Sequence, residues 1–96
     1  MEEIARVYGD ALFGVAKEEG KLDEIREQLG QFADAVAEDR ELQVFFFSPY
    51  FSSQEKRDGI AKAVSGGEPE LVNFLELLAE KHRMPAIFRI RRRFDE

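Results

Sequence analysis

Apolar residues recur every three or four positions along nearly the whole of this 96-residue chain. This period is that of one face of an α-helix, whereas a half-buried strand alternates every second residue. No such alternation occurs, and neither an internal repeat nor a low-complexity linker interrupts the pattern. The sequence therefore predicts an all-α fold in one domain over residues 1–96, a compact bundle of about six helices with short connections.

Glycine, proline and serine mark the expected helix ends. The residue before Pro49 avoids the α region, so a short helix over 41–47 should stop there. Ser52 to Glu55 has the spacing of a capping box, in which each side chain bonds the other residue's amide. The first expected helix ends at Gly20, the second runs over 22–38 and the third over 41–47. The fourth starts after Ser52 and ends at Ser65-Gly66-Gly67. The fifth starts at Glu68-Pro69, and the sixth runs from Pro85 to Phe94.

Composition and charge exclude several classes of protein. The chain has no cysteine, which rules out disulfides, thiol catalysis and thiolate metal sites. Its longest apolar run, residues 44–47, is far too short to span a membrane, and Met1-Glu2-Glu3 does not begin a secretory signal, so we expect a soluble, intracellular protein. Residues 1–80 carry 8 basic and 18 acidic side chains, and this acidic body argues against nonspecific nucleic-acid binding by the whole domain.

Catalytic patterns are missing from the sequence. The one histidine, His82, lies near the end of the fifth expected helix, where a positive group complements the helix dipole. No nucleophile-elbow motif accompanies it, and Gly66-Gly67 lacks the residues that complete a phosphate-binding loop. The acidic run over 18–27 is typical of a solvated helix face. We therefore expect no catalytic residue, no cofactor, no metal site and no enzymatic activity.

Two unusual stretches each allow two interpretations. Residues 81–96 carry 6 basic and 2 acidic side chains, and the segment Arg89–Arg93 either pairs with the acidic body or contacts RNA, as in a helical bundle of the antitermination-factor type. The run Phe45-Phe46-Phe47, followed by Tyr50 and Phe51, either fills the core or forms an exposed patch. We favour the core, because a domain of this size is short of large apolar residues.

The first and fifth expected helices have unusually wide apolar faces. On the fifth helix the apolar arc covers roughly 220°, against about 100° or somewhat more for an ordinary surface helix. Either neighbours within the bundle cover both faces, or an amphipathic helix from a partner lies between them. A second copy of the chain is a third possible occupant. Periodicity alone does not separate these possibilities.

Four stretches occur in an order that is similar to one known family. They are Ile4–Phe13, Glu19–Leu22, Phe47-Ser48-Pro49 followed by Ser52–Lys56, and Asn73–Glu80 with Arg83 and Pro85 behind it. The first resembles the Ala-Arg-Pro-Tyr-Ala-x-Ala-Leu-Phe opening of the delta subunit of F-type ATP synthases, called the oligomycin-sensitivity-conferring protein in mitochondria. The resemblance covers nearly the whole chain.

Three departures from that family pattern stand out. Val7 replaces a common proline, Gly9 replaces a usual alanine, and Lys81-His82 replaces a common Asn-Gly, which removes the left-handed glycine from the turn after the fifth helix. The family's proteins are also about twice this length by domain arithmetic. The chain therefore resembles the N-terminal domain alone, without the C-terminal part that engages the b-subunit stalk.

The resemblance implies a non-catalytic role in the peripheral stalk, or stator, of a rotary ATP synthase. It implies a six-helix bundle that holds the amphipathic N-terminal helix of an alpha subunit between its first and fifth helices. The complex would lie at the cytoplasmic face of the bacterial membrane, or on the equivalent organellar side, without direct nucleic-acid binding or membrane insertion by this domain. Carried over by position, the partner-binding residues are Tyr8, Ala11, Leu12, Val15, Phe74, Leu75, Leu78 and Ala79, with Arg6 and Glu80 as possible rim residues.

Overall fold

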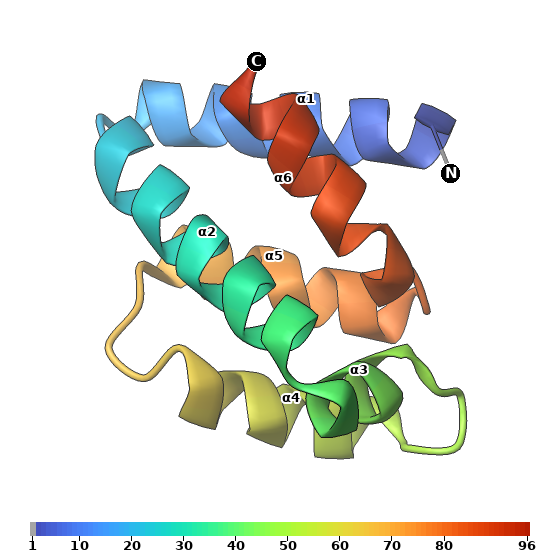
Figure 1. Cartoon of the computed structure of the whole chain (residues 1–96). Coiled ribbons are helices and arrows are strands. Elements are labelled where there is room, and N and C mark those ends of the chain that lie inside the picture. Colours follow the sequence, from blue (N-terminus) through green and yellow to red (C-terminus); the bar gives the residue numbers. More distant parts are fainter. Residues whose placement is uncertain (1) are drawn as a thin grey trace.

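The computed structural model describes residues 2–96, and every regular element in that range is helical. This confirms the predicted all-α fold with six α-helices (Figure 1). The elements are α1 (Glu2–Glu18), α2 (Leu22–Glu38), α3 (Arg40–Phe47), α4 (Ser53–Ala63), α5 (Pro69–Glu80), the 3-10 turn η1 (Met84–Ala86) and α6 (Ile87–Asp95).

Local sequence signals account for most of the helix ends. The capping box before α4 is confirmed: Ser52 Oγ accepts from the Glu55 amide at 3.1 Å, and the Glu55 carboxylate accepts from the Ser52 amide at 2.8 Å. Gly20 ends α1 with a φ of 70°. The next amide, that of Lys21, then bonds the Ala16 carbonyl at 2.8 Å, which gives the left-handed ending common at helix C-termini.

Two helix starts differ from the prediction. α3 begins at Arg40, one residue early, because the Asp39 side chain accepts from the amides of Glu41 and Leu42 and so caps the helix. The last helix was predicted to start at Pro85, but Pro85 lies in η1 and α6 starts at Ile87. The Ala86 amide bonds the Arg83 carbonyl at 3.0 Å, and this tighter 3-10 hydrogen bond precedes the α-helical ones.

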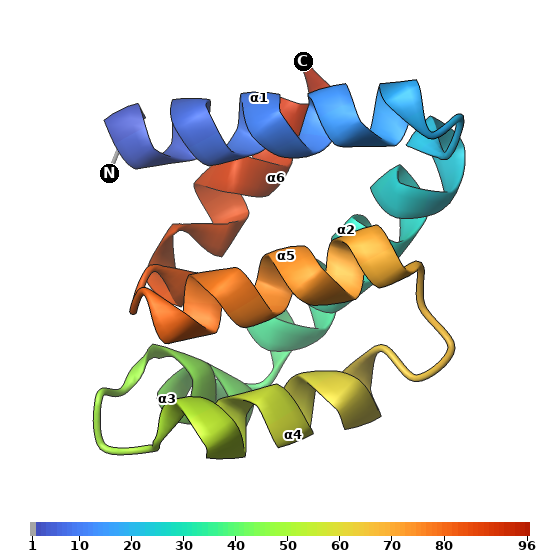
Figure 2. The same cartoon turned by 180° about the vertical axis from the view of Figure 1, so that it is seen from behind.

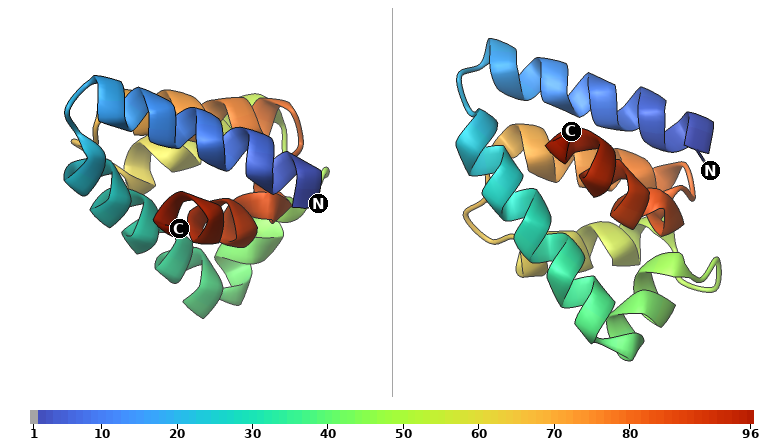
Figure 3. Two further views of the ribbon diagram at one scale, coloured as in Figure 1. Left: turned by 90° about the horizontal axis from the view of Figure 1, so that it is seen from above. Right: turned by 45° about the horizontal axis from the view of Figure 1, so that its top comes forward.

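The helices α5 and α6 have different positions in the bundle. α5 lies between α1 and α4, and Figure 2 shows these three helices on one face of the molecule. α6 packs most extensively against α1 and also against α2. In the view from above, α1 and α6 are close to the viewer while α3 and α4 lie farther away (Figure 3). α5 is therefore the central helix, whereas α1 has neighbours on one side only.

The core draws on every helix, and its aromatic members settle the question of the phenylalanine run. Phe46 is 1% exposed and contacts Phe32 edge-on with ring centroids 5.4 Å apart, while Phe45 and Phe47 are half-buried. The prediction of a core role is therefore right for Phe46. It is wrong for Tyr50, which lies in the turn after α3 and is 86% exposed.

Candidate functional site

The wide apolar arc of α5 is mostly covered inside the bundle. Its fully buried side chains sit between α1, α4 and α2, so neighbours within the domain occupy both flanks of the helix. Only Leu77, which is 40% exposed, offers a large apolar surface on this helix. Burial by the central position of α5 therefore explains most of this wide face without a partner. The buried residues of α5 are Leu71, Phe74, Leu75, Leu78 and Ala79.

Five of the eight predicted partner-binding residues belong to the core. Leu12, Leu75, Leu78 and Ala79 are at most 2% exposed. These side chains cannot contact a partner unless the bundle opens, so their assignment to a docking surface does not match their burial. Phe74, at 9%, is almost as deeply buried.

On α1 the situation is different, because one line of apolar side chains is only partly covered. Val7 and Val15 are 49% and 43% exposed, and Ala11 between them is exposed as well. Residues four apart stack on one side of a helix, so these three form a continuous surface line, here called the α1 strip. The α1 strip contains two of the eight predicted partner-binding residues and adds Val7.

A contact between two aromatic rings shows on which side of the bundle the α1 strip lies. Tyr8 of α1 and Phe74 of α5 meet edge-on with centroids 6.1 Å apart. On a helical projection the α1 strip is next to Tyr8, and Leu77 is next to Phe74, each on the outer side of the contact. The α1 strip and Leu77 therefore flank the seam between α1 and α5, two helices that Figure 2 shows on one face of the molecule. We call this surface the α1–α5 face.

Polar contacts join α1 and α5 at both ends of this face. Arg83, just after α5, donates from Nη1 to the Tyr8 hydroxyl at 2.7 Å, and its guanidinium lies 5.5 Å from the centre of the Tyr8 ring. At the opposite end, Lys21 Nζ lies 3.0 Å from a Glu68 carboxylate oxygen and 3.2 Å from one of Glu70. The two helices are therefore antiparallel neighbours, held together at each end.

The carboxylates beside Lys21 change the proton affinity of this end. Hydrogen bonds to Glu68 and Glu70 raise the pKa of Lys21 above its ordinary value. The pKa of Glu70 is lowered, first by its own backbone amide at the start of α5 and then by Lys21. Both groups therefore remain charged at neutral pH.

The two predicted rim residues lie in different places. Arg6 pairs with Glu3 within α1, and it lines a polar pocket of 310 Å³ between the start of α1 and the end of α6. It therefore faces away from the α1–α5 seam. Glu80 is exposed one turn beyond Leu77, beside the α1–α5 face.

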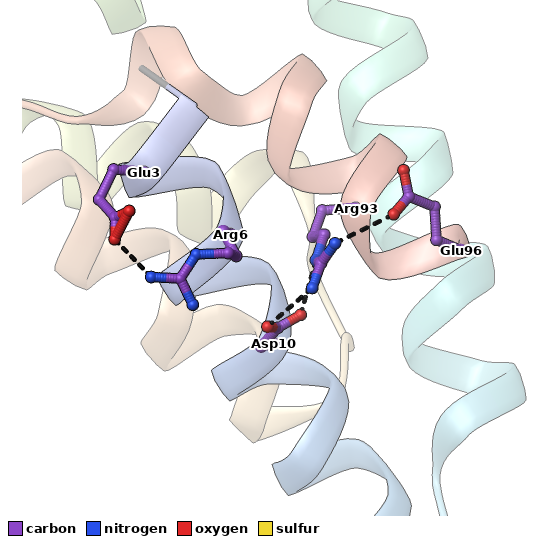
Figure 4. A network of polar contacts seen from close by, with 5 residues as sticks. All are labelled: Glu3, Arg6, Asp10, Arg93 and Glu96. Carbon is purple, nitrogen blue, oxygen red and sulfur yellow. Dashed lines mark hydrogen bonds and ion pairs between the residues drawn. The ribbon is translucent and has the colours of Figure 1, made fainter.

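Acidic side chains of the body pair with most of the basic segment. Arg93 bonds Asp10 of α1 (Figure 4), Arg91 bonds Asp34 of α2 at 2.7 Å, and Arg89 lies 3.6 Å from Glu2. A phosphate backbone would have to displace these carboxylates, so the arrangement gives no support to the RNA-binding alternative.

His82 takes the place of the missing left-handed glycine after α5. It has a φ of 57°, the only positive φ of a non-glycine residue in the described range 2–96. The amides of Arg83 and His82 bond the carbonyls of Leu78 at 2.8 Å and Ala79 at 3.2 Å, which is the Schellman pattern. The turn thus keeps its usual geometry with histidine where glycine is favoured. His82 is exposed and therefore has a role in the turn rather than in a buried site.

Two further findings concern residues 2–96. No three histidine, cysteine, aspartate or glutamate side chains there are grouped so as to hold a metal ion. None of the helices in this range combines the length and the apolar character needed to cross a membrane.

The fold and its surface are those of a small all-α domain whose exposed features are an apolar face and a set of ion pairs. The family described as ATP synthase delta (OSCP) subunit matches residues 4–96, and the chain belongs to this family.

Curated relatives agree with this assignment. The chain is 34% identical over 89 residues to the ATP synthase subunit delta of Rubrobacter xylanophilus, covering 93% of this chain and 50% of that protein. It is 36% identical over 97 residues to the corresponding subunit of Myxococcus xanthus, covering 97% and 53%. The chain therefore spans about half the length of the curated relatives that it matches.

Sequence reasoning did not assign Val7 and Leu77 to the surface. Both belong to the apolar periodicity, so the signal for a helix face was present. Periodicity shows how wide a face is, but it does not show which edge of that face the rest of the bundle covers. Only the position of each helix among its neighbours decides that.

Proposed function

We propose that this domain is the N-terminal part of a stator subunit of an F-type ATP synthase, and that its α1–α5 face binds the amphipathic N-terminal helix of an alpha subunit. In this role the domain does no chemistry. It connects the catalytic head to the peripheral stalk at the cytoplasmic side of the membrane, while the C-terminal half of the longer relatives reaches the b-subunit stalk. The stalk then keeps the head from turning with the rotor.

One observation carries this proposal: the α1 strip is exposed although its residues are apolar, as the residues of a buried helix face usually are. A contiguous apolar surface on a small domain marks a site of interaction. Leu77, on the α5 side of the Tyr8–Phe74 contact, adds a large exposed apolar side chain, so the face includes residues of both helices. Such a surface suits an amphipathic helix with apolar anchors one turn apart. Membership of the delta family supports the choice of an alpha-subunit helix as the partner.

Calorimetric titration with an alpha-subunit N-terminal peptide tests the proposal. Burial of apolar surface should give a negative heat-capacity change and an affinity that varies little with salt. Ala11→Glu should weaken binding at least about tenfold, because a carboxylate would be desolvated against the apolar peptide face. Helicity should persist, since Ala11 is exposed.

Ala61→Glu is the matched control, because Ala61 is exposed on α4, which lies on the other side of α5 from α1. It should bind like the unmodified domain. The absence of any measurable heat with the unmodified domain would refute the proposed function. Equal affinities for Ala11→Glu and Ala61→Glu would show that the peptide does not bind at the α1–α5 face.

A further inference from the structure

The α1–α5 face carries opposite charges at its two ends. The α1 strip continues, three residues after Val15, into Glu18. On α5 the line through Leu77 continues, four residues later, into Lys81. Both side chains are exposed. Because α1 and α5 are antiparallel, Glu18 and Lys81 lie at opposite ends of the face.

Neighbouring charges strengthen this difference. Glu19 is exposed beside Glu18, and the glutamates Glu68 and Glu70 share the single amine of Lys21, so this end has an excess of negative charge. At the other end, Arg83 adds a second positive charge to that of Lys81. The hydrogen-bond partner of Arg83 is the Tyr8 hydroxyl, which is neutral.

Acidic groups near the basic end do not reverse its sign. Glu3 is paired with Arg6. Glu80 projects on the outer side of Leu77, away from Phe74. The dipoles of α1 and α5 largely oppose each other, since the helices run in opposite directions. Charged side chains therefore determine the polarity of the face.

A docked helix also has a polarity, with partial positive charge at its N-terminus and partial negative charge at its C-terminus. From this match we infer that the partner helix binds in one direction: its N-terminus lies beside Glu18 and its C-terminus beside Lys81 and Arg83. It then runs antiparallel to α1 and parallel to α5. Lys81 and Arg83 are placed to donate to the last carbonyls of the helix, which have no partner within it. This inference rests on the proposed function of the same face.

Paramagnetic broadening of backbone amide signals tests the direction. A nitroxide at the N-terminus of the alpha-subunit peptide should broaden the amide signals of residues 18–21 and of Glu68 and Glu70 of the domain. A nitroxide at its C-terminus should instead broaden residues 81–83 and Tyr8. The reverse pattern, or equal broadening at both ends, overturns the inference while leaving the docking face intact. A peptide that does not bind refutes the proposed function itself.

Charge reversal tests the cause of the direction. Lys81→Glu and Glu18→Lys should each weaken peptide binding about two- to fivefold at low salt, the range expected for charges near a helix end. The difference should shrink at high salt. Lys62→Glu, in the last turn of α4 and away from the face, is the control and should leave the affinity unchanged. Unchanged affinity in both Lys81→Glu and Glu18→Lys overturns the electrostatic origin.

Discussion

Arg93 of α6 binds Asp10 of α1 through two parallel hydrogen bonds, from Nε to Oδ1 at 2.8 Å and from Nη2 to Oδ2 at 3.1 Å. The aliphatic part of the same arginine lies on Gly9, where an added Cβ would come within 2.8 Å of Arg93 Cγ. The two helices thus approach closely where α1 has no side chain, and the guanidinium reaches over to the next residue. One arginine therefore contributes both packing and an ion pair to the α1–α6 crossing.

The Asp10–Arg93 pair makes stability depend on pH. The hydrogen bonds from Arg93 hold the pKa of Asp10 below its ordinary value. A lowered pKa stabilises the fold above the unfolded value, about 3.9, and this stabilisation is lost as the pH falls through the folded value. Asp10→Asn should therefore be less stable than the unmodified domain at pH 7, and the two should converge toward pH 3.

Urea unfolding at both pH values measures this effect. Glu27→Gln is the control, since Glu27 is exposed and pairs with no basic side chain among residues 2–96. It should change stability little at either pH. A constant gap between Asp10→Asn and the unmodified domain from pH 7 to pH 3 would contradict the role given to the ion pair.

Two glycines of α1 should respond in opposite ways to the same substitution. Gly9→Ala should lower the unfolding free energy by about 1–3 kcal/mol, because the methyl group meets Arg93 Cβ and the Ile90 carbonyl as well as Arg93 Cγ. Gly14 is exposed and has nothing within 4 Å of an added Cβ. Gly14→Ala should therefore raise stability by about 0.5–1 kcal/mol, the ordinary helix preference for alanine. Thermal unfolding of both variants checks the signs, and a stabilising Gly9→Ala would show that the crossing is looser than described.

His82 adopts a left-handed conformation that costs a side-chain-bearing residue about 1–2 kcal/mol relative to an ordinary one. His82→Gly should relieve most of this and raise the unfolding free energy by up to about 1 kcal/mol. Lys81, the preceding residue, has a φ of −86° and needs no glycine. Lys81→Gly should accordingly destabilise the domain by a few tenths to about 1 kcal/mol. Chemical denaturation of both variants measures the two changes, and unfolding free energies that shift in the same direction would contradict the prediction.

Leu77 and Leu78 are adjacent in sequence but differ in role. Leu78 is fully buried, so Leu78→Ala should cost about 2–5 kcal/mol of stability. Leu77 is 40% exposed, so Leu77→Ala should cost less than about 1.5 kcal/mol and act chiefly on peptide binding. Denaturation and calorimetric titration of each variant separate the two effects. Equal losses of stability would mean that Leu77 belongs to the core.

The sequence was most informative where the signal is local. The extent of α2, the capping box at Ser52 and the stop of α1 at Gly20 each depend on a few neighbouring residues, and all three were predicted. The tight turn at Pro85 was missed because proline suits the first turn of a 3-10 helix as well as that of an α-helix.

Burial around the two wide helices was not predictable in the same way. Leu78 and Leu77 are equally apolar, and only the position of α5 between α1 and α4 makes one of them core and the other surface. The same holds for Leu12 and Val15 of α1, of which α6 and the core cover only the first. Such differences arise from packing between segments distant in sequence, which a periodic pattern does not record.

Tyr8 with Arg83, and Lys21 with Glu68 and Glu70, fasten α1 and α5 together at both ends. A lateral force on a partner bound along these helices therefore cannot separate one helix from the other without acting on both sets of polar contacts. The lateral force is distributed as shear over two helices and their common core, rather than concentrated on one segment of the backbone. In the role proposed above, a load on the docked helix would therefore act on both helices rather than on one of them alone.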